Sequence, residues 1–86
     1  MARAIVADRK ATRSEVASHA REIRAVAEEL GLERVRVRDD GTVVAHSEEA
    51  GYRAVMLLSG AATNLVGTYV HVITDDVPGA ADATEL

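Results

Sequence analysis

Residues 35–46 read VRVRDDGTVVAH, two short valine-rich runs on either side of Asp39-Asp40-Gly41. In the first run Val35 and Val37 alternate with arginines, the pattern of a strand with one buried and one charged side. An Asp-Gly pair between two such runs is typical of a tight turn. The stretch therefore predicts a β-hairpin, and the rest of the fold is arranged around it.

The turn leaves two strand registers open. A two-residue turn at Asp40-Gly41 places Val37 opposite Val44, whereas a three-residue turn with Gly41 as a bulge places Val37 opposite Val43. A slip of one residue turns every side chain to the other face of the sheet. The register therefore decides whether His46 faces the core or the arginines.

An amphipathic helix is predicted over residues 12–30. Its apolar stripe has spacings of four, three, four and three and consists of Val16, Ala20, Ile23, Ala27 and Leu30. Thr12 and Glu15 have the spacing of a capping box, and Gly31 followed by Leu32 is a typical helix end. Asp8 is an alternative start one turn earlier.

A second helix is predicted from an N-cap at Ser47 to about Val66, with Gly67 ending it. Its apolar residues cover most of the circumference, so it needs either a sheet on one side and a helix or second subunit on the other, or full burial. Gly60 costs a helix interior about 1 kcal/mol relative to alanine, and close packing beside Ala61-Ala62 is the expected compensation. Alternatively, residues 52–58 form a strand.

Residues 68–74 are β-branched and apolar on both sides, which indicates a covered strand. The predicted fold class is α+β, with the order helix, strand, strand, helix, strand and a small mixed sheet covered by two helices. Residues 1–79 are expected to form a single domain. Residues 80–86 show no periodicity, so a flexible C-terminal tail is expected.

Charge is divided unevenly along the 86 residues. Residues 1–38 hold nine of the ten Lys and Arg against six acids, and residues 39–86 hold one base against eight acids. The basic half suggests a nucleic-acid face at Arg34, Arg36 and Arg38, but it has no aromatic residue for base stacking. The absence of cysteine and of any long apolar run favours a cytoplasmic protein that does not enter a membrane.

The segment from Ala20 to Asp76 resembles the minimal nucleotidyltransferases of prokaryotic toxin–antitoxin pairs. In that family a helix ending in x-L-G leads to a strand written V-R-V-F-G-S, a strand bearing D-x-D, a helix, and a strand of the kind V-D-V-V-T. The corresponding pieces here are EIRAVAEELGLERVRVRDD, TVVAH, YRAVMLLSGAATNLVG and YVHVITDD. The resemblance implies a nucleotidyltransferase-like scaffold.

The family's catalytic groups are replaced in this chain. Asp39-Asp40 stands where Gly-Ser would cradle a triphosphate, and its charge would repel phosphate. No D-x-D follows the turn, and His71 occupies the third-strand position of an aspartate. Two-metal phosphoryl transfer needs clustered carboxylates. The resemblance therefore implies a scaffold that has lost catalysis.

A different site remains an alternative. His46, His71, Asp75 and Asp76 would form a metal or ligand site of nitrogen and oxygen donors if the second and third strands are neighbours. An alternative function is a small metal- or nucleotide-dependent enzyme or ligand-binding domain that uses Asp39, Asp40, His46, His71 and Asp75. Asp75-Asp76 also reads as a turn starter, and histidines at strand ends are more often structural.

The leading hypothesis is a non-catalytic protein-interaction domain, the antitoxin or regulatory subunit of a toxin–antitoxin-type pair. It would act by dimerisation or by covering a partner protein, which is the toxin or a second copy, and no cofactor is expected. The broadly apolar second helix motivates this hypothesis. Tyr52, Met56 and Leu57 are the candidate partner-binding residues, since aromatic and methionine side chains are favoured in interface cores.

Overall fold

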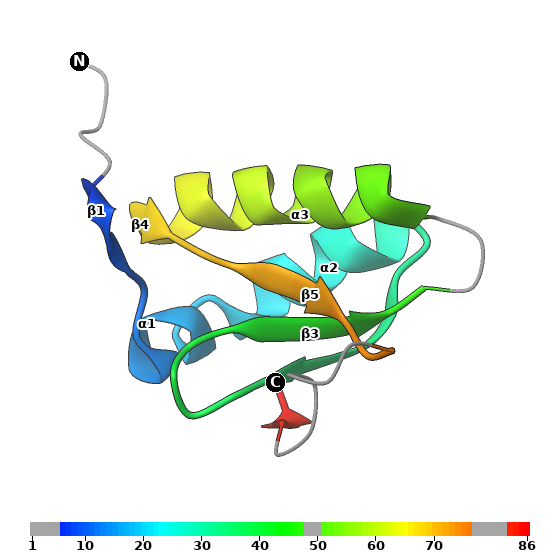
Figure 1. The fold of residues 1–86 in the computed structure, drawn as a ribbon, viewed down its shortest axis with the longest axis horizontal. Coiled ribbons are helices and arrows are strands. Elements are labelled where there is room, and N and C mark those ends of the chain that lie inside the picture. The colour runs from blue at the N-terminus through cyan, green and yellow to red at the C-terminus, as the bar shows by residue number, and fades with distance from the viewer. Residues whose placement is uncertain (1–5, 48–50, 77–82) are drawn as a thin grey trace.

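The computed structural model describes residues 6–47, 51–76 and 83–86. It confirms the α+β class and contains the predicted order helix, strand, strand, helix, strand (Figure 1). The elements are β1 (Val6–Lys10), α1 (Arg13–Ala17), α2 (Ala20–Glu29), β2 (Glu33–Val37), β3 (Val43–His46), α3 (Gly51–Val66), β4 (Thr68–Tyr69), β5 (Val72–Thr74) and β6 (Thr84–Glu85).

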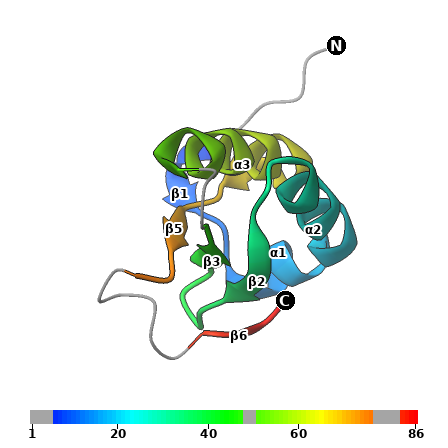
Figure 2. The ribbon, with the colours of Figure 1, turned by 90° about the vertical axis from the view of Figure 1, so that its right-hand side faces the viewer.

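The strands form a mixed four-stranded sheet and a small parallel pair. The order in the larger sheet is β5-β3-β2-β6, with β3 antiparallel to β2 and parallel to β5, while β1 pairs with β4. Figure 2 shows α2 and α3 on the same side of this sheet. The two-helix cover of the prediction is confirmed. No helix of the described residues has the length and apolar character needed to cross a bilayer.

The hairpin adopts the three-residue turn. Val37 lies opposite Val43, and the Arg38 N–H donates to the Thr42 carbonyl across 2.9 Å. Gly41 has a φ of +88°, a conformation that glycine adopts without steric cost. Of the two registers left open by the sequence, the one with Gly41 as a bulge is therefore correct.

This register directs His46 away from the core. Arg36 lies opposite Val44, and the pairing shifts by one residue between positions 36 and 33, where Arg34 has a φ of +48°. The His46 ring contacts Asp75, and Asp75 lies 3.8 Å from a guanidinium nitrogen of Arg36. His46 therefore faces the arginine side of the sheet.

The predicted helix over 12–30 is wrong in one respect, because it is broken into α1 and α2. His19 has φ −116° and ψ 21°, outside the helical region, and the Ser18 hydroxyl donates to the Glu15 carbonyl across 2.7 Å. A serine hydroxyl that takes a backbone acceptor competes with the helix. The apolar stripe survives the break, since Val16, Ile23 and Ala27 are all buried.

Both ends of this helical segment follow the prediction. Thr12 and Glu15 form the capping box, with the Glu15 N–H 3.2 Å from the Thr12 hydroxyl and the Thr12 N–H 2.9 Å from the Glu15 carboxylate. At the other end Gly31 has a φ of +79°, and the Leu32 N–H donates back to the Ala27 carbonyl. The alternative start at Asp8 is wrong, because that residue lies in β1.

The second helix is confirmed, with Gly67 ending it at a φ of +87°. Residues 48–50, at its expected start, lie outside the described residues. Its buried residues share one core cluster with α2 and β5, so a helix and a sheet cover it as expected. The alternative strand over residues 52–58 is wrong, because these residues lie within α3. The expected close packing around Gly60 is also wrong, since a Cβ at Gly60 would have no neighbour within 4 Å.

Two parts of the chain differ from the expected outline. The strand predicted over 68–74 is divided into β4 and β5, with Val70 buried between them. In the segment expected to be a loose tail, Thr84–Glu85 pairs with β2 and Leu86 packs against the core, while residues 80–82 lie outside the described part. The alternation in so short a strand is too brief to recognise in a sequence.

Gly41 and Gly60 provide opposite tests of backbone freedom. A Cβ at Gly41 would lie 2.1 Å from the Ala11 carbonyl oxygen, in addition to the positive φ. We expect Gly41→Ala to lower the free energy of unfolding by more than about 2 kcal/mol. Gly60→Ala should raise it by about 1 kcal/mol, since the site is exposed and helical. Urea unfolding followed by circular dichroism measures both, and a similar loss in the two variants would contradict this account.

Candidate protein-interaction groove

The described surface carries four large exposed apolar side chains. Their exposed fractions are 76% for Tyr52, 57% for Met56, 49% for Leu57 and 40% for Tyr69. The two tyrosines are the only aromatic residues of the chain. Exposed apolar patches mark interaction sites, and aromatic and methionine side chains are enriched in interface cores.

Tyr52, Met56 and Tyr69 line one groove of about 410 Å³ between α3 and the segment that runs from β4 through β5. The other lining residues are Val55 and Ser59 from the helix and residues 71–74 from the strand. Leu57 is not among the lining residues. Of the three predicted partner-binding residues, the structure therefore brings Tyr52 and Met56 together and leaves Leu57 outside the groove.

One wall of the groove is the outer edge of β5, the terminal strand of the sheet. Its inner edge bonds to β3 through the Val43 N–H and the His71 carbonyl (2.8 Å), and through the Asp75 N–H and the Ala45 carbonyl (3.1 Å). Because backbone groups alternate along a strand, the N–H and C=O groups of Val72 and Thr74 point away from β3. No strand among the described residues pairs with them, and such an edge is a template for another chain.

At Val70, two residues before Val72, the outward backbone groups are already hydrogen-bonded. The Ser59 hydroxyl donates to the Val70 carbonyl (2.6 Å), and the Val70 N–H donates to the Thr63 hydroxyl oxygen (3.0 Å). Two side chains of α3 thus satisfy both backbone groups of Val70. The open part of the edge begins at Val72, beside the exposed side chains of Tyr52 and Met56.

His71 and Tyr69 form a polar pair on the strand wall. The Tyr69 hydroxyl and the His71 Nδ1 are 2.9 Å apart, and the ring centroids are 6.0 Å apart. Both residues line the groove, and the His71 Nδ1 is engaged by Tyr69.

The four candidate metal or ligand residues do not form one set. His46 Nδ1 lies 2.9 Å from the Asp75 carboxylate, but His71 pairs with Tyr69, and Asp76 accepts a hydrogen bond from the Thr74 hydroxyl. Among the described residues, no three His, Asp or Glu side chains are grouped to hold a metal ion. The strands do bring His46 and Asp75 together, as the neighbouring positions of β3 and β5 require.

Asp39 and Asp40 act as structural groups at the turn. Asp39 accepts from the Arg13 guanidinium at 2.6 Å. Asp40 accepts from the Thr42 N–H at 3.0 Å and lies 3.2 Å from the Lys10 ammonium. The hydrogen bond from the Thr42 N–H, supported by Lys10, lowers the pKa of Asp40 to about 2. Both carboxylates tie the turn to the N-terminal segment.

The lowered pKa of Asp40 predicts that the free energy of unfolding falls in acid. Its folded pKa of about 2 lies below the ordinary value of 3.8, so its contribution is present above about pH 4 and is lost as the pH falls towards 2. Asp40→Asn should flatten the decline of the unfolding free energy between pH 5 and about pH 2. Urea unfolding across this range measures the effect, and an unchanged slope would contradict it.

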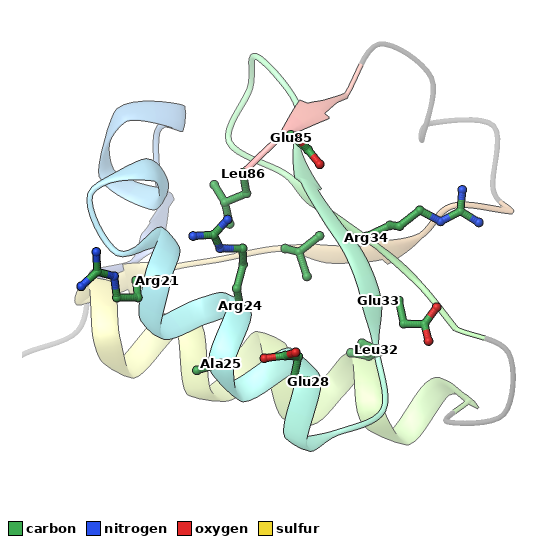
Figure 3. Close-up of a pocket in the computed structure, with 10 residues that line it drawn as sticks. Arg21, Arg24, Ala25, Glu28, Leu32, Glu33, Arg34, Glu85 and Leu86 are labelled. Carbon is green, nitrogen blue, oxygen red and sulfur yellow. The ribbon is translucent and has the colours of Figure 1, made fainter.

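Arg34 and Arg36, two of the three residues proposed for a nucleic-acid face, have different surroundings. The half-buried Arg36 lies by Asp75, whereas Arg34 lines a hollow of about 570 Å³ between α2, β2 and β6. In Figure 3 the Arg34 side chain points away from Arg24. The charged side chains that line this hollow are three arginines and three glutamates, so their formal charges cancel: Arg21, Arg24, Arg34, Glu28, Glu33 and Glu85. An anionic ligand therefore finds no excess positive charge there.

Sequence reasoning missed the strand wall of the groove. Tyr69 had been assigned to a covered strand, and nothing in the sequence showed that β5 would be an edge strand. The one available signal was that Tyr52 and Tyr69 are the only aromatic residues.

No family model, curated protein or solved structure matches this chain. The resemblance to minimal nucleotidyltransferases therefore stays a prediction from the residue pattern.

Proposed function

We propose that the chain is a non-catalytic protein-interaction domain, acting in the cytoplasm as the antitoxin or regulatory subunit of a toxin–antitoxin-type pair. Its docking surface is the groove between α3 and the open edge of β5. One observation carries the proposal: three of the four large exposed apolar side chains line this groove, namely Tyr52, Met56 and Tyr69.

The groove offers the two components of strand addition. The backbone groups of Val72 and Thr74 provide hydrogen bonds for an extended segment, which gives affinity without sequence preference. Tyr52 and Met56 provide apolar contacts for its side chains, which gives selectivity. A protein partner can use both, and burial of the exposed side chains contributes about 25 cal/mol per Å² of apolar surface.

The absence of catalysis is supported by the partners of the acidic residues. Asp39 and Asp40 are bound by Arg13 and Lys10, and the Asp75 carboxylate is bound by His46. Asp39 and Asp40 thus serve the scaffold at the position where a nucleotidyltransferase would cradle phosphate, and the aspartate of its third strand is replaced by His71. The toxin–antitoxin setting comes from the resemblance alone, and the groove supports the wider role of protein binding.

Met56 and Leu57 form a matched pair for testing the docking surface. Both are exposed apolar residues of α3, with exposed fractions of 57% and 49%, but only Met56 lines the groove. We expect Met56→Asp to weaken association by at least about tenfold, because it buries a charge in the interface, and Leu57→Asp to change it less than about threefold.

The measurement is size-exclusion chromatography with light scattering, on the chain alone and co-expressed with the protein of the adjacent gene. Circular dichroism confirms that both variants are folded. If the chain forms no complex with itself or that protein, or if the two variants behave alike, the proposed docking surface is wrong.

A further inference from the structure

We propose that the groove is occupied by a second copy of this chain, with the two β5 strands paired antiparallel about a two-fold axis at Ile73. This inference rests on the proposed function and names the partner for the same site. Joining two sheets at β5 would produce one continuous sheet with an α3 helix from each copy on the same side.

The open backbone groups select the register. Val72 and Thr74 direct their N–H and C=O groups outward, so Val72 of one copy and Thr74 of the other can exchange both bonds of a hydrogen-bonded pair. The two-fold axis generates this pair twice. It also places Ile73 of one copy opposite Ile73 of the other, in a non-hydrogen-bonded position. A slip that placed Val72 opposite itself would bring Thr74 to Val70, whose backbone groups are already bound by Ser59 and Thr63.

The same register pairs complementary polar groups. His71 of one copy lies opposite Asp75 of the other, on the face that also carries Ile73, because side chains two apart share a face. When the His71 Nδ1 accepts the Tyr69 hydroxyl hydrogen, its Nε2 carries a hydrogen to donate. The Asp75 carboxylate contacts His46 and Arg36 of its own copy, and its remaining lone pairs can accept this hydrogen.

The exposed side chains of α3 fit the same arrangement. Tyr52 and Met56 lie on the groove side of the helix, directly beside the β5 edge. Two sheets joined at that edge bring these side chains of both copies into one apolar contact between the helices. The interface then has hydrogen bonds on the strand and an aromatic and methionine core, which is the usual composition of such contacts.

Cysteine cross-linking tests the register directly, because the chain has no native cysteine. We expect Ile73→Cys to form a disulfide between copies under mild oxidation, since residues opposite each other at a non-hydrogen-bonded position are about 4.5 Å apart at Cα. Thr74→Cys is the matched control. Position 74 of the other copy lies diagonally across the strand pair, at about 7–8 Å, which is too far for a disulfide. The Thr74→Cys variant should therefore remain monomeric on non-reducing gels.

Charge exchange tests the polar pair. His71→Asp should raise the dimer dissociation constant by about tenfold, because the new carboxylate at position 71 of each copy then lies opposite Asp75 of the other copy. Mixing His71→Asp with Asp75→His should restore association, since each copy then meets the opposite group. Light scattering measures both, and the native chain should show twice its mass of 9.1 kDa.

The outcomes separate this inference from the proposed function. A cross-link at position 73 with none at position 74 supports the dimer. A monomeric native chain without a cross-link at 73 overturns it, and if Met56→Asp still abolishes binding of the adjacent gene's protein, the proposed function stands. A dimer that cross-links at 74 and not at 73 overturns the register.

Discussion

The hydrogen bond between the Arg38 N–H and the Thr42 carbonyl closes a three-residue turn and sets the register of the β2–β3 hairpin. Because Val37 is thereby placed opposite Val43, both residues face the helices, and Arg36 and His46 face the other side. β5 pairs parallel with the other edge of β3, with Val43 opposite Val72 and Ala45 opposite Thr74. This pairing directs the His71 carbonyl and the Asp75 N–H toward β3, so the Val72 and Thr74 backbone groups point outward.

The aspartates of this turn show why residue type alone is weak evidence for a site. Two adjacent carboxylates after a strand suggest phosphate or metal chemistry, but each is matched by a cation from the N-terminal segment. These ion pairs are partly exposed, so each contributes little to the free energy of folding. Their larger effect is positional, since they link β1 and α1 to the turn at which a Cβ on Gly41 would clash with the Ala11 carbonyl oxygen.

Helix α3 both completes the core and shapes the groove. Ala54, Val55, Leu58 and Ala62 are buried in the core cluster, while Ser59 and Thr63 bind the backbone of Val70. The hydroxyl contacts close part of the strand edge and leave the next residues open. The exposed side chains of Tyr52 and Met56 lie beside the open part, which is why association is the function that this arrangement favours.

The sequence by itself determined the class of the fold, the hairpin, the apolar stripe of the first helical segment, the helix caps and the apolar character of α3. These features depend on local periodicity, glycine conformation and side-chain capping, which act over a few residues. It also predicted Tyr52, Met56 and Leu57 as partner-binding residues, because aromatic and methionine side chains are favoured in interface cores, and all three are exposed.

Only the tertiary structure decided the hairpin register, the break at Ser18-His19, the pairing of Thr84–Glu85 with β2, and the position of β5 at the sheet edge. The strand pairings depend on energies that arise between residues far apart in the chain, whereas the break follows from the hydrogen bond of the Ser18 hydroxyl to the Glu15 carbonyl, which competes with an equally local helical pattern. The separation of Met56 from Leu57 belongs to the same group, since neighbouring positions on a helix differ in what packs beside them. Strand order is a long-range property, and local patterns do not encode it.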